Sequence, residues 1–215
     1  MKLFQKKYQG FVRSHYIDPT PKEIEKISEN YELHDIVVED IIDIHTQDKV
    51  DQYDDHIFFV IHFPRYDVSR NKYALNELNV IFLNGKLITI SSFDLDQMEE
   101  LYKEIDDSET NYTPYMVVYK LLDLIYTSVS KSLQTFTRSL FVLEEEMFDN
   151  EVLPKHLLES LTIKRRNAIF LKHTFITHSE ILTELHTATG TYFGEESDVY
   201  YEDLEFKIDK ITNAI

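Results

Sequence analysis

The feature that most constrains the fold is a helical apolar pattern that fills almost all of the chain after residue 113. Apolar side chains recur there at spacings of three and four, the period of one face of an α-helix. The first series is Leu122, Ile125, Val129, Phe136, Leu140, Leu143 and Met147, and the second is Leu157, Leu161, Ala168, Leu171, Phe175, Leu182 and Leu185. Asp149-Asn150-Glu151 separates them, with Pro154 just inside the second helix. Two long helices with matching seams and a short connector predict an antiparallel hairpin.

Local signals predict where these helices begin and end. Thr113-Pro114 is typical of a helix start. Gly190 and Gly194 indicate the end of the hairpin, and a third helix is expected to begin at residue 197 or 198. Its pattern is unfinished at Ile215, so we expect the chain to be a piece of a longer protein.

The first half of the chain predicts short strands and helices. Residues 7–17 are rich in aromatic and β-branched side chains and are expected to form one or two strands. Thr20 as N-cap, Pro21 at the first helical position and Glu23 completing a capping box predict a helix over residues 21–30.

Further along, a second short helix is expected over residues 35–44. Its apolar side is formed by Ile36, Val37, Ile41 and Ile42. Residues 57–63 are a nearly continuous apolar run that stops at Pro64, which predicts a central strand buried on both faces. Asn84-Gly85 between two apolar runs predicts an antiparallel hairpin with a type I′ turn. A helix over residues 94–105 follows.

Together these elements predict an α+β or α/β fold, with a mixed, largely antiparallel sheet and flanking helices, followed by the long helical hairpin. We expect an α/β domain over residues 1–110, the hairpin packed on it over residues 111–195, and the start of the third helix over residues 196–215. The apolar content of 43% is sufficient for a packed core.

Charge and composition limit the classes of function. The 39 acids and 22 bases give a net charge of −17, which repels nucleic acid and attracts cations, although solubility alone is an equally good interpretation. The absence of cysteine excludes disulfides and thiolate metal sites. The first residues lack the apolar segment of a signal peptide, and no run approaches the ~18 apolar residues of a membrane span. We therefore expect the chain as given to be soluble.

No motif for catalysis is present. The sequence has no glycine-rich phosphate loop, no nucleophile elbow and no HExxH, so we predict that it is not an enzyme. His178 lies in the apolar seam, which favours a hydrogen-bonded structural histidine over a zinc ligand.

Two acidic groups are interpreted as solvated surface, with cation attraction as the alternative at the second. The first is Asp43, His45, Asp48, Asp51, Asp54, Asp55 and His56, which lack the spacing of a calcium loop. The second is Glu144-Glu145-Glu146 with Asp149 and Glu151 at the hairpin tip, where Lys164-Arg165-Arg166 of the return helix is expected to pair with them.

The segment from Asn30 to Lys49 resembles the cytosolic domain of the CorA family of divalent-cation channels. The positions that carry the resemblance are Tyr31, Leu33-His34, Val38-Glu39-Asp40-Ile41 and Lys49-Val50, followed by the strand at 57–63, Asn84-Gly85, Lys164-Arg165-Arg166-Asn167 and Tyr200-Tyr201-Glu202-Asp203. The resemblance covers nearly the whole chain. It implies that residues 196–215 begin a stalk helix, and that two membrane spans with Gly-Met-Asn between them would follow Ile215.

The resemblance also implies a mechanism and its residues. Five protomers would surround one pore at the cytoplasmic face of the inner membrane, which this chain would reach only through helices beyond its end. Divalent ions at the protomer interfaces would hold the pore shut, with Mg²⁺ as the expected ion and Co²⁺, Ni²⁺ or Zn²⁺ as alternatives. The acids at the family's bridging positions are Asp40, Asp203, Glu39 and Asp123. Such hard cations prefer oxygen ligands, and facing acids repel one another once the ion leaves.

Two alternatives remain at this point. One is the zinc-transporting branch of the same superfamily, which shares the fold. The other is a stand-alone acidic helical adaptor that binds a basic protein partner, in which case the four acids would simply be solvated. No nucleic-acid partner is expected.

Overall fold

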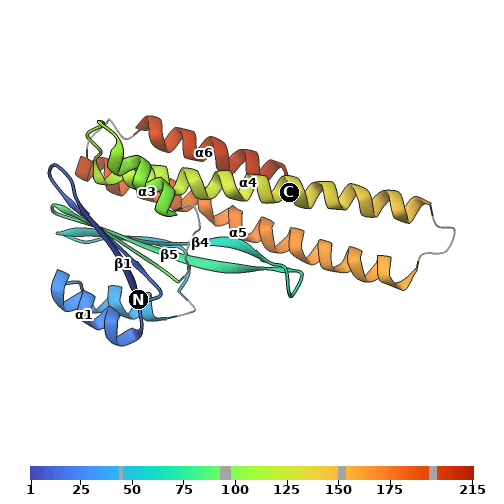
Figure 1. The fold of residues 1–215 in the computed structure, drawn as a ribbon, viewed down its shortest axis with the longest axis horizontal. Coiled ribbons are helices and arrows are strands. Elements are labelled where there is room, and N and C mark those ends of the chain that lie inside the picture. Colours follow the sequence, from blue (N-terminus) through green and yellow to red (C-terminus); the bar gives the residue numbers. More distant parts are fainter. Residues whose placement is uncertain (44–45, 93–97, 150–153, 194–197) are drawn as a thin grey trace.

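The computed structural model describes residues 1–43, 46–92, 98–149, 154–193 and 198–215, and places one six-stranded sheet between two helical layers (Figure 1). The strands are β1 (Lys2–Lys7), β2 (Val12–Ile17), β3 (Lys49–Gln52), β4 (His56–Asp67), β5 (Lys72–Leu83) and β6 (Lys86–Ser91). Their order across the sheet is β1-β2-β6-β5-β4-β3, and the β2–β6 pair is parallel while the other pairs are antiparallel. The predicted fold class is therefore confirmed.

Helices α1 (Pro21–Tyr31) and α2 (Asp35–Ile42) form the first helical layer. The Glu23 carboxylate accepts hydrogen bonds from the backbone N–H and the hydroxyl of Thr20, both at 2.8 Å, so α1 begins where predicted. On α2, Val37 is buried against the sheet, but Ile36 is 50% exposed. The four-residue apolar side predicted for α2 was wrong, because so short a helix buries only the one stripe formed by residues four apart, and Ile42 is exposed as well.

The centre of the sheet is β4, which is buried on both faces as predicted. Ile57, Phe59, Ile61 and Phe63 contribute to the core under the long helices, while Phe58 and Val60 contribute to the core under α1 and α2. The strand does not stop at Pro64 but continues to Asp67. Its partner β3 pairs only as far as Val60, so the missing N–H of Pro64 faces an edge without a strand and costs no ladder hydrogen bond.

The turn between β5 and β6 lies at Asn84-Gly85, but it is not type I′. A type I′ turn needs positive φ at both central residues, whereas only Gly85 has it, at +68°. The carbonyl of Gly85 accepts a hydrogen bond from the N–H of Val12 at 2.9 Å, which ties this turn to the start of β2.

The second layer contains α3 (Met98–Asp107), α4 (Pro114–Phe148), α5 (Lys155–Phe193) and α6 (Asp198–Asn213). Thr113 caps α4 by accepting a hydrogen bond from the N–H of Met116 at 3.4 Å, which confirms the predicted start. Helix α5 continues through Gly190, the first of the two glycines predicted as its end, because a single glycine costs a helix only about 1 kcal/mol, which packing against α6 can offset. The helix ends at Phe193, and the second of those glycines, Gly194, lies outside the described residues. Helix α6 returns along α4 and α5, and its buried residues join their core (Figure 1).

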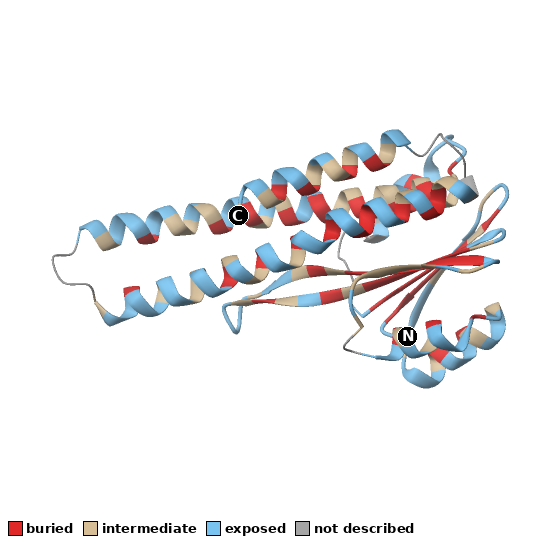
Figure 2. Ribbon diagram, turned by 180° about the vertical axis from the view of Figure 1, so that it is seen from behind, coloured by how far each residue is buried: buried red, intermediate tan, exposed pale blue. Residues whose placement is uncertain are grey.

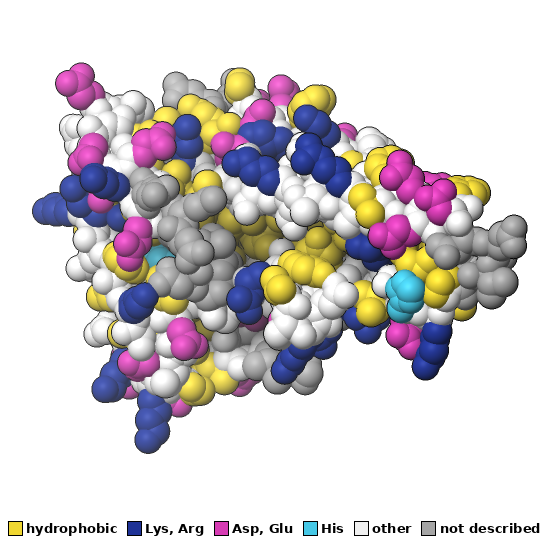
Figure 3. Space-filling model, turned by 45° about the vertical axis from the view of Figure 1, so that its right-hand side comes forward, with side chains coloured by type: hydrophobic (Ala, Val, Ile, Leu, Met, Phe, Trp, Pro, Cys, Tyr) yellow, Lys and Arg dark blue, Asp and Glu magenta, His cyan; other side chains and the backbone are white. Residues whose placement is uncertain are grey.

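The far halves of α4 and α5 project beyond the sheet and are mostly exposed (Figure 2). Figure 3 shows acidic side chains gathered at this tip and Lys and Arg side chains behind it. The first residue of the basic triplet, Lys164, donates to Ser139 Oγ at 2.6 Å rather than reaching Glu144–Glu146, because α5 begins at Lys155 and Lys164 is more than two turns into it. Among the described helices, none has the length and apolar content needed to cross a bilayer.

Candidate cation-binding acids and a buried histidine network

The four acids proposed as ion ligands fall on opposite sides of the sheet. Glu39 and Asp40 lie on α2, in the first helical layer, whereas Asp123 lies on α4 and Asp203 on α6, in the second layer. The fold therefore brings Asp123 and Asp203 together but keeps both apart from the α2 pair. Within the described ranges, no three His, Asp or Glu side chains converge as a metal site.

Asp123 and Asp203 are joined by a lysine. The ammonium of Lys207 donates to the carboxylate of Asp123 and lies 2.9 Å from Asp203 Oδ2, and the Tyr119 hydroxyl also donates to Asp203 Oδ2 at 2.9 Å. The hydrogen bond from Lys207 is the main cause that lowers the pKa of Asp203. Burial lowers the pKa of Lys207, but the two carboxylates outweigh burial and raise it, so the ammonium stays charged at neutral pH.

Asp40 has a similar arrangement at the other side of the sheet. Lys49 at the start of β3 lies 2.5 Å from Asp40 Oδ2 and 2.8 Å from Asp51 Oδ2. The hydroxyl of Thr46 donates to the backbone carbonyl of Asp40 at 2.7 Å, which holds the end of α2 to the start of β3. Glu39 is exposed on the outer side of the helix. Three of the four predicted ligands, Asp40, Asp123 and Asp203, thus each share a lysine ammonium with a second carboxylate.

A second polar cluster, which we call the histidine network, lies between the sheet and α5. His62 of β4 donates from Nδ1 to Asp48 Oδ1 at 2.7 Å, and its Nε2 lies 3.4 Å from Glu77 Oε2 of β5. Asp48 also accepts hydrogen bonds from the His62 backbone N–H at 2.9 Å and from the Thr177 hydroxyl at 3.0 Å. Burial lowers the pKa of His62, but the two carboxylates outweigh it and raise the pKa to about 9, so His62 is an imidazolium at neutral pH.

His178 completes this network as a neutral histidine. Its Nε2 donates to the backbone carbonyl of His62 at 2.8 Å, and its Nδ1 accepts from the buried Tyr126 hydroxyl at 3.2 Å. Burial lowers the pKa of His178 to about 4, against the smaller opposing effect of Asp48. The prediction that His178 is a hydrogen-bonded structural histidine is confirmed.

The interpretation of residues 43–56 as solvated surface was wrong in part. The side chain of Asp48 is only 10% exposed, and His56 is buried beneath Tyr53, whose ring stacks on it at 4.4 Å. Asp54 and Asp55 are exposed as expected, and His45 lies outside the described residues. The sequence contains only a weak signal for the pairing of Asp48 with His62. Asp48 is a polar residue directly before a strand, and His62 is the one polar residue within the apolar run of residues 57–63.

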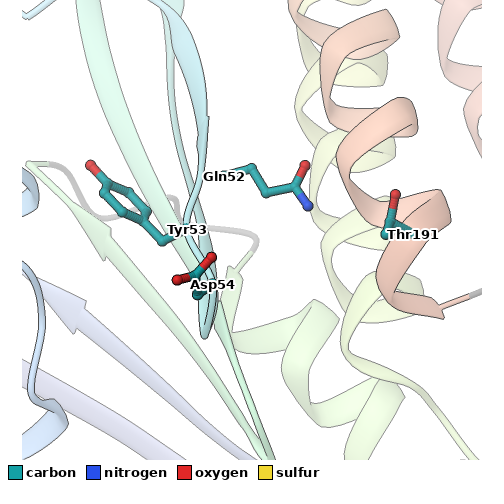
Figure 4. Close-up of a pocket in the computed structure, with 4 residues that line it drawn as sticks. All are labelled: Gln52, Tyr53, Asp54 and Thr191. Atoms are coloured by element: carbon teal, nitrogen blue, oxygen red, sulfur yellow. The ribbon is translucent and has the colours of Figure 1, made fainter.

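Two open pockets lie beside the histidine network and the turn between β3 and β4. A pocket of about 780 Å³ runs beside the histidine network and includes Asp48, His62, Glu77, His173 and Thr177. A second, of about 550 Å³, lies between the β3–β4 turn and α5 (Figure 4). The side chain of Gln52 points across it toward Thr191, and Tyr53 points away.

Both the sequence and the fold of this chain are similar to those of CorA-like proteins. The sequence model of a family described as "CorA-like Mg2+ transporter protein" matches residues 8–215. A curated relative, the cobalt/magnesium transport protein CorA of Thermotoga maritima, is 20% identical over 185 residues, which cover 84% of this chain and 52% of the relative. This chain thus spans about half the length of that protein.

Solved structures share the fold at low sequence identity. The CorA magnesium transporter of Methanocaldococcus jannaschii matches with a TM-score of 0.80 at 18% identity, over 95% of this chain and 64% of the other. Its soluble domain matches with 0.79 at 17% identity, over 95% and 81%. The ZntB cytoplasmic domain of Vibrio parahaemolyticus matches with 0.75 at 12% identity, over 96% and 81%.

Proposed function

Because this chain belongs to the family of CorA-like Mg²⁺ transporter proteins, we propose that it is the cytosolic ion-sensing domain of a homopentameric magnesium channel. The domain would bind intracellular Mg²⁺, with Co²⁺ and Ni²⁺ as further ions, between neighbouring protomers at the inner face of the cell membrane. Its ligands would be Asp40 and Asp203, with Glu39 and Asp123 beside them. The family consists of transport proteins rather than enzymes, and membership in it removes the support for a stand-alone adaptor.

The observation that carries the proposal is the position of Asp40 and Asp203 on opposite sides of one chain. One ion cannot join them within a protomer, because the sheet and the α4–α5 layer lie between α2 and α6. The same ion can join Asp203 of one copy to Asp40 of the next. Such a head-to-tail contact repeats around an axis and closes a ring if the rotation permits.

The chemistry of these groups suits Mg²⁺. Carboxylate oxygens are ligands that a hard cation prefers, and Mg²⁺ retains much of its water, so a few carboxylates around a hydrated ion are enough. Asp203 and Asp40 are only partly exposed, which limits screening by solvent. When the ion leaves, the approach of two carboxylates becomes unfavourable and loosens the contact.

The ligand assignment is tested by Asp40→Asn together with Asp203→Asn in the full-length pentamer. We expect Mg²⁺ at millimolar concentration to protect the wild type from limited proteolysis and to give no protection to this double variant, because its main ion ligands are lost. Asp35→Asn with Asp209→Asn is the matched control, since both residues are exposed and lie on the same two helices. Protection that survives in the Asp40/Asp203 variant would remove these residues from the site. Parallel titrations with Zn²⁺ test the zinc-transporting alternative.

The 215-residue chain alone is expected to be monomeric or weakly associated in sedimentation experiments. In the proposed channel the pore helices tether the ring, and a contact built on one hydrated ion and a few carboxylates is weak without that tether. A stable pentamer of this chain in the presence of a chelator would contradict the proposed role of the ion.

A further inference from the structure

Lys207 occupies the place that a cation shared by Asp123 and Asp203 would take. Its ammonium lies between a carboxylate on α4 and one on α6, in contact with both. Asp203 and Lys207 are four residues apart on α6 and therefore share one helical face. The side chains of Lys207 and Asp123 are 27% and 28% exposed, so an ion can reach them from solvent.

We propose that Lys207 is a tethered counter-ion that competes with divalent cations for Asp123 and Asp203 and thereby raises the ion concentration that the sensor requires. The inference rests on the proposed function, because it assigns the regulation of the same acids. An ammonium and a metal ion cannot both lie between the two carboxylates, so the ion must displace Lys207. The long, flexible lysine side chain can move into solvent when this happens.

The lysine also changes what ion release does to the domain. Without Lys207, an empty site would hold two carboxylates on adjacent helices with no cation between them. With Lys207 present, α4 and α6 stay joined by an internal ion pair when the divalent ion leaves. Lys49 has the same relation to Asp40 and Asp51, so the acids on both sides of the proposed protomer contact are already paired before an ion arrives.

The test is the Mg²⁺ concentration that protects the full-length pentamer from limited proteolysis, because the proposed ion lies between Asp123 and Asp203 of one protomer and Asp40 of the next. Lys207→Met should bind Mg²⁺ about tenfold more tightly than the wild type, since the ion no longer has to separate the ammonium from two carboxylates. Two contacts between unit charges at about 4 Å together exceed this factor even in water. In the presence of a chelator, the melting temperature of Lys207→Met should be lower than that of the wild type, because Asp123 and Asp203 then have no cation between them. Added Mg²⁺ should restore it.

Lys207→Arg keeps the charge and should bind as the wild type does. Lys210→Met, which removes one charge from an exposed position on α6, separates the local effect from that of net charge. Lys207→Met binding Mg²⁺ no more tightly than Lys210→Met would overturn the inference. Asp203→Asn tests the proposed function separately: if Mg²⁺ binding is unchanged in this variant, the ligand assignment fails whatever Lys207 does.

Discussion

Replacing Asp48 with alanine is expected to lower the free energy of unfolding by about 3 to 5 kcal/mol, the usual cost of removing one partner of a buried ion pair. The Asp48 carboxylate accepts three hydrogen bonds, from the His62 ring, the His62 backbone N–H and the Thr177 hydroxyl. The variant would leave these donors without their acceptor, in a region where His62 is 12% exposed.

Urea unfolding at pH 7, followed by circular dichroism, measures this effect. Glu159→Ala is the matched control, because it also removes one carboxylate and one ion pair, with Lys155, but at a position 62% exposed. That exposed pair should contribute at most about 0.5 kcal/mol. If Asp48→Ala costs no more than Glu159→Ala, the network does not stabilise the contact between sheet and helix.

The regular elements of this protein are largely predictable because their signals are local. The capping residues Thr20 and Glu23 start α1, Thr113 starts α4, and the nearly continuous apolar run of β4 reflects burial on both faces. The predictions that were wrong depend on neighbours that a local pattern does not contain. Pro64 stays in a strand because β3 has already ended, and α5 passes through Gly190 because α6 packs along it.

In the candidate site, too, local spacing predicts some contacts, while the others depend on the tertiary structure. Asp123 and Asp203 are 80 residues apart, and only the family resemblance paired them before the fold did. Lys207 follows Asp203 by four residues, a spacing that predicts an ion pair on α6, but nothing local predicts that its ammonium also contacts α4. The histidine network joins β4, β5 and α5 with the residue that precedes β3, and every pairing in it requires the tertiary structure.

The stability of this protein is expected to fall on both sides of neutral pH, because His62 and His178 titrate in opposite directions. The pKa of His178 is depressed to about 4, so its contribution is present above pH 6.5 and is lost as pH falls from 6.5 through 4. The pKa of His62 is raised to about 9, so its contribution is fully present below pH 6.5 and is lost as pH rises through 9. We call the decrease of the free energy of unfolding below pH 6.5 the acid limb and its decrease above pH 6.5 the alkaline limb. The decrease over the acid limb should reach about 3 kcal/mol, since each unit of pKa corresponds to about 1.4 kcal/mol.

Urea unfolding between pH 4 and pH 9.5 tests both limbs, and two variants assign them. His178→Gln cannot be protonated and should flatten the acid limb relative to the wild type, whereas His62→Gln should flatten the alkaline limb. Comparing each variant with the wild type at the same pH cancels the titration of groups elsewhere in the chain. Asp48, Glu77 and Tyr126 face the two histidines and are unchanged in both variants. If the acid limb is as steep in His178→Gln as in the wild type, its cause lies outside this histidine.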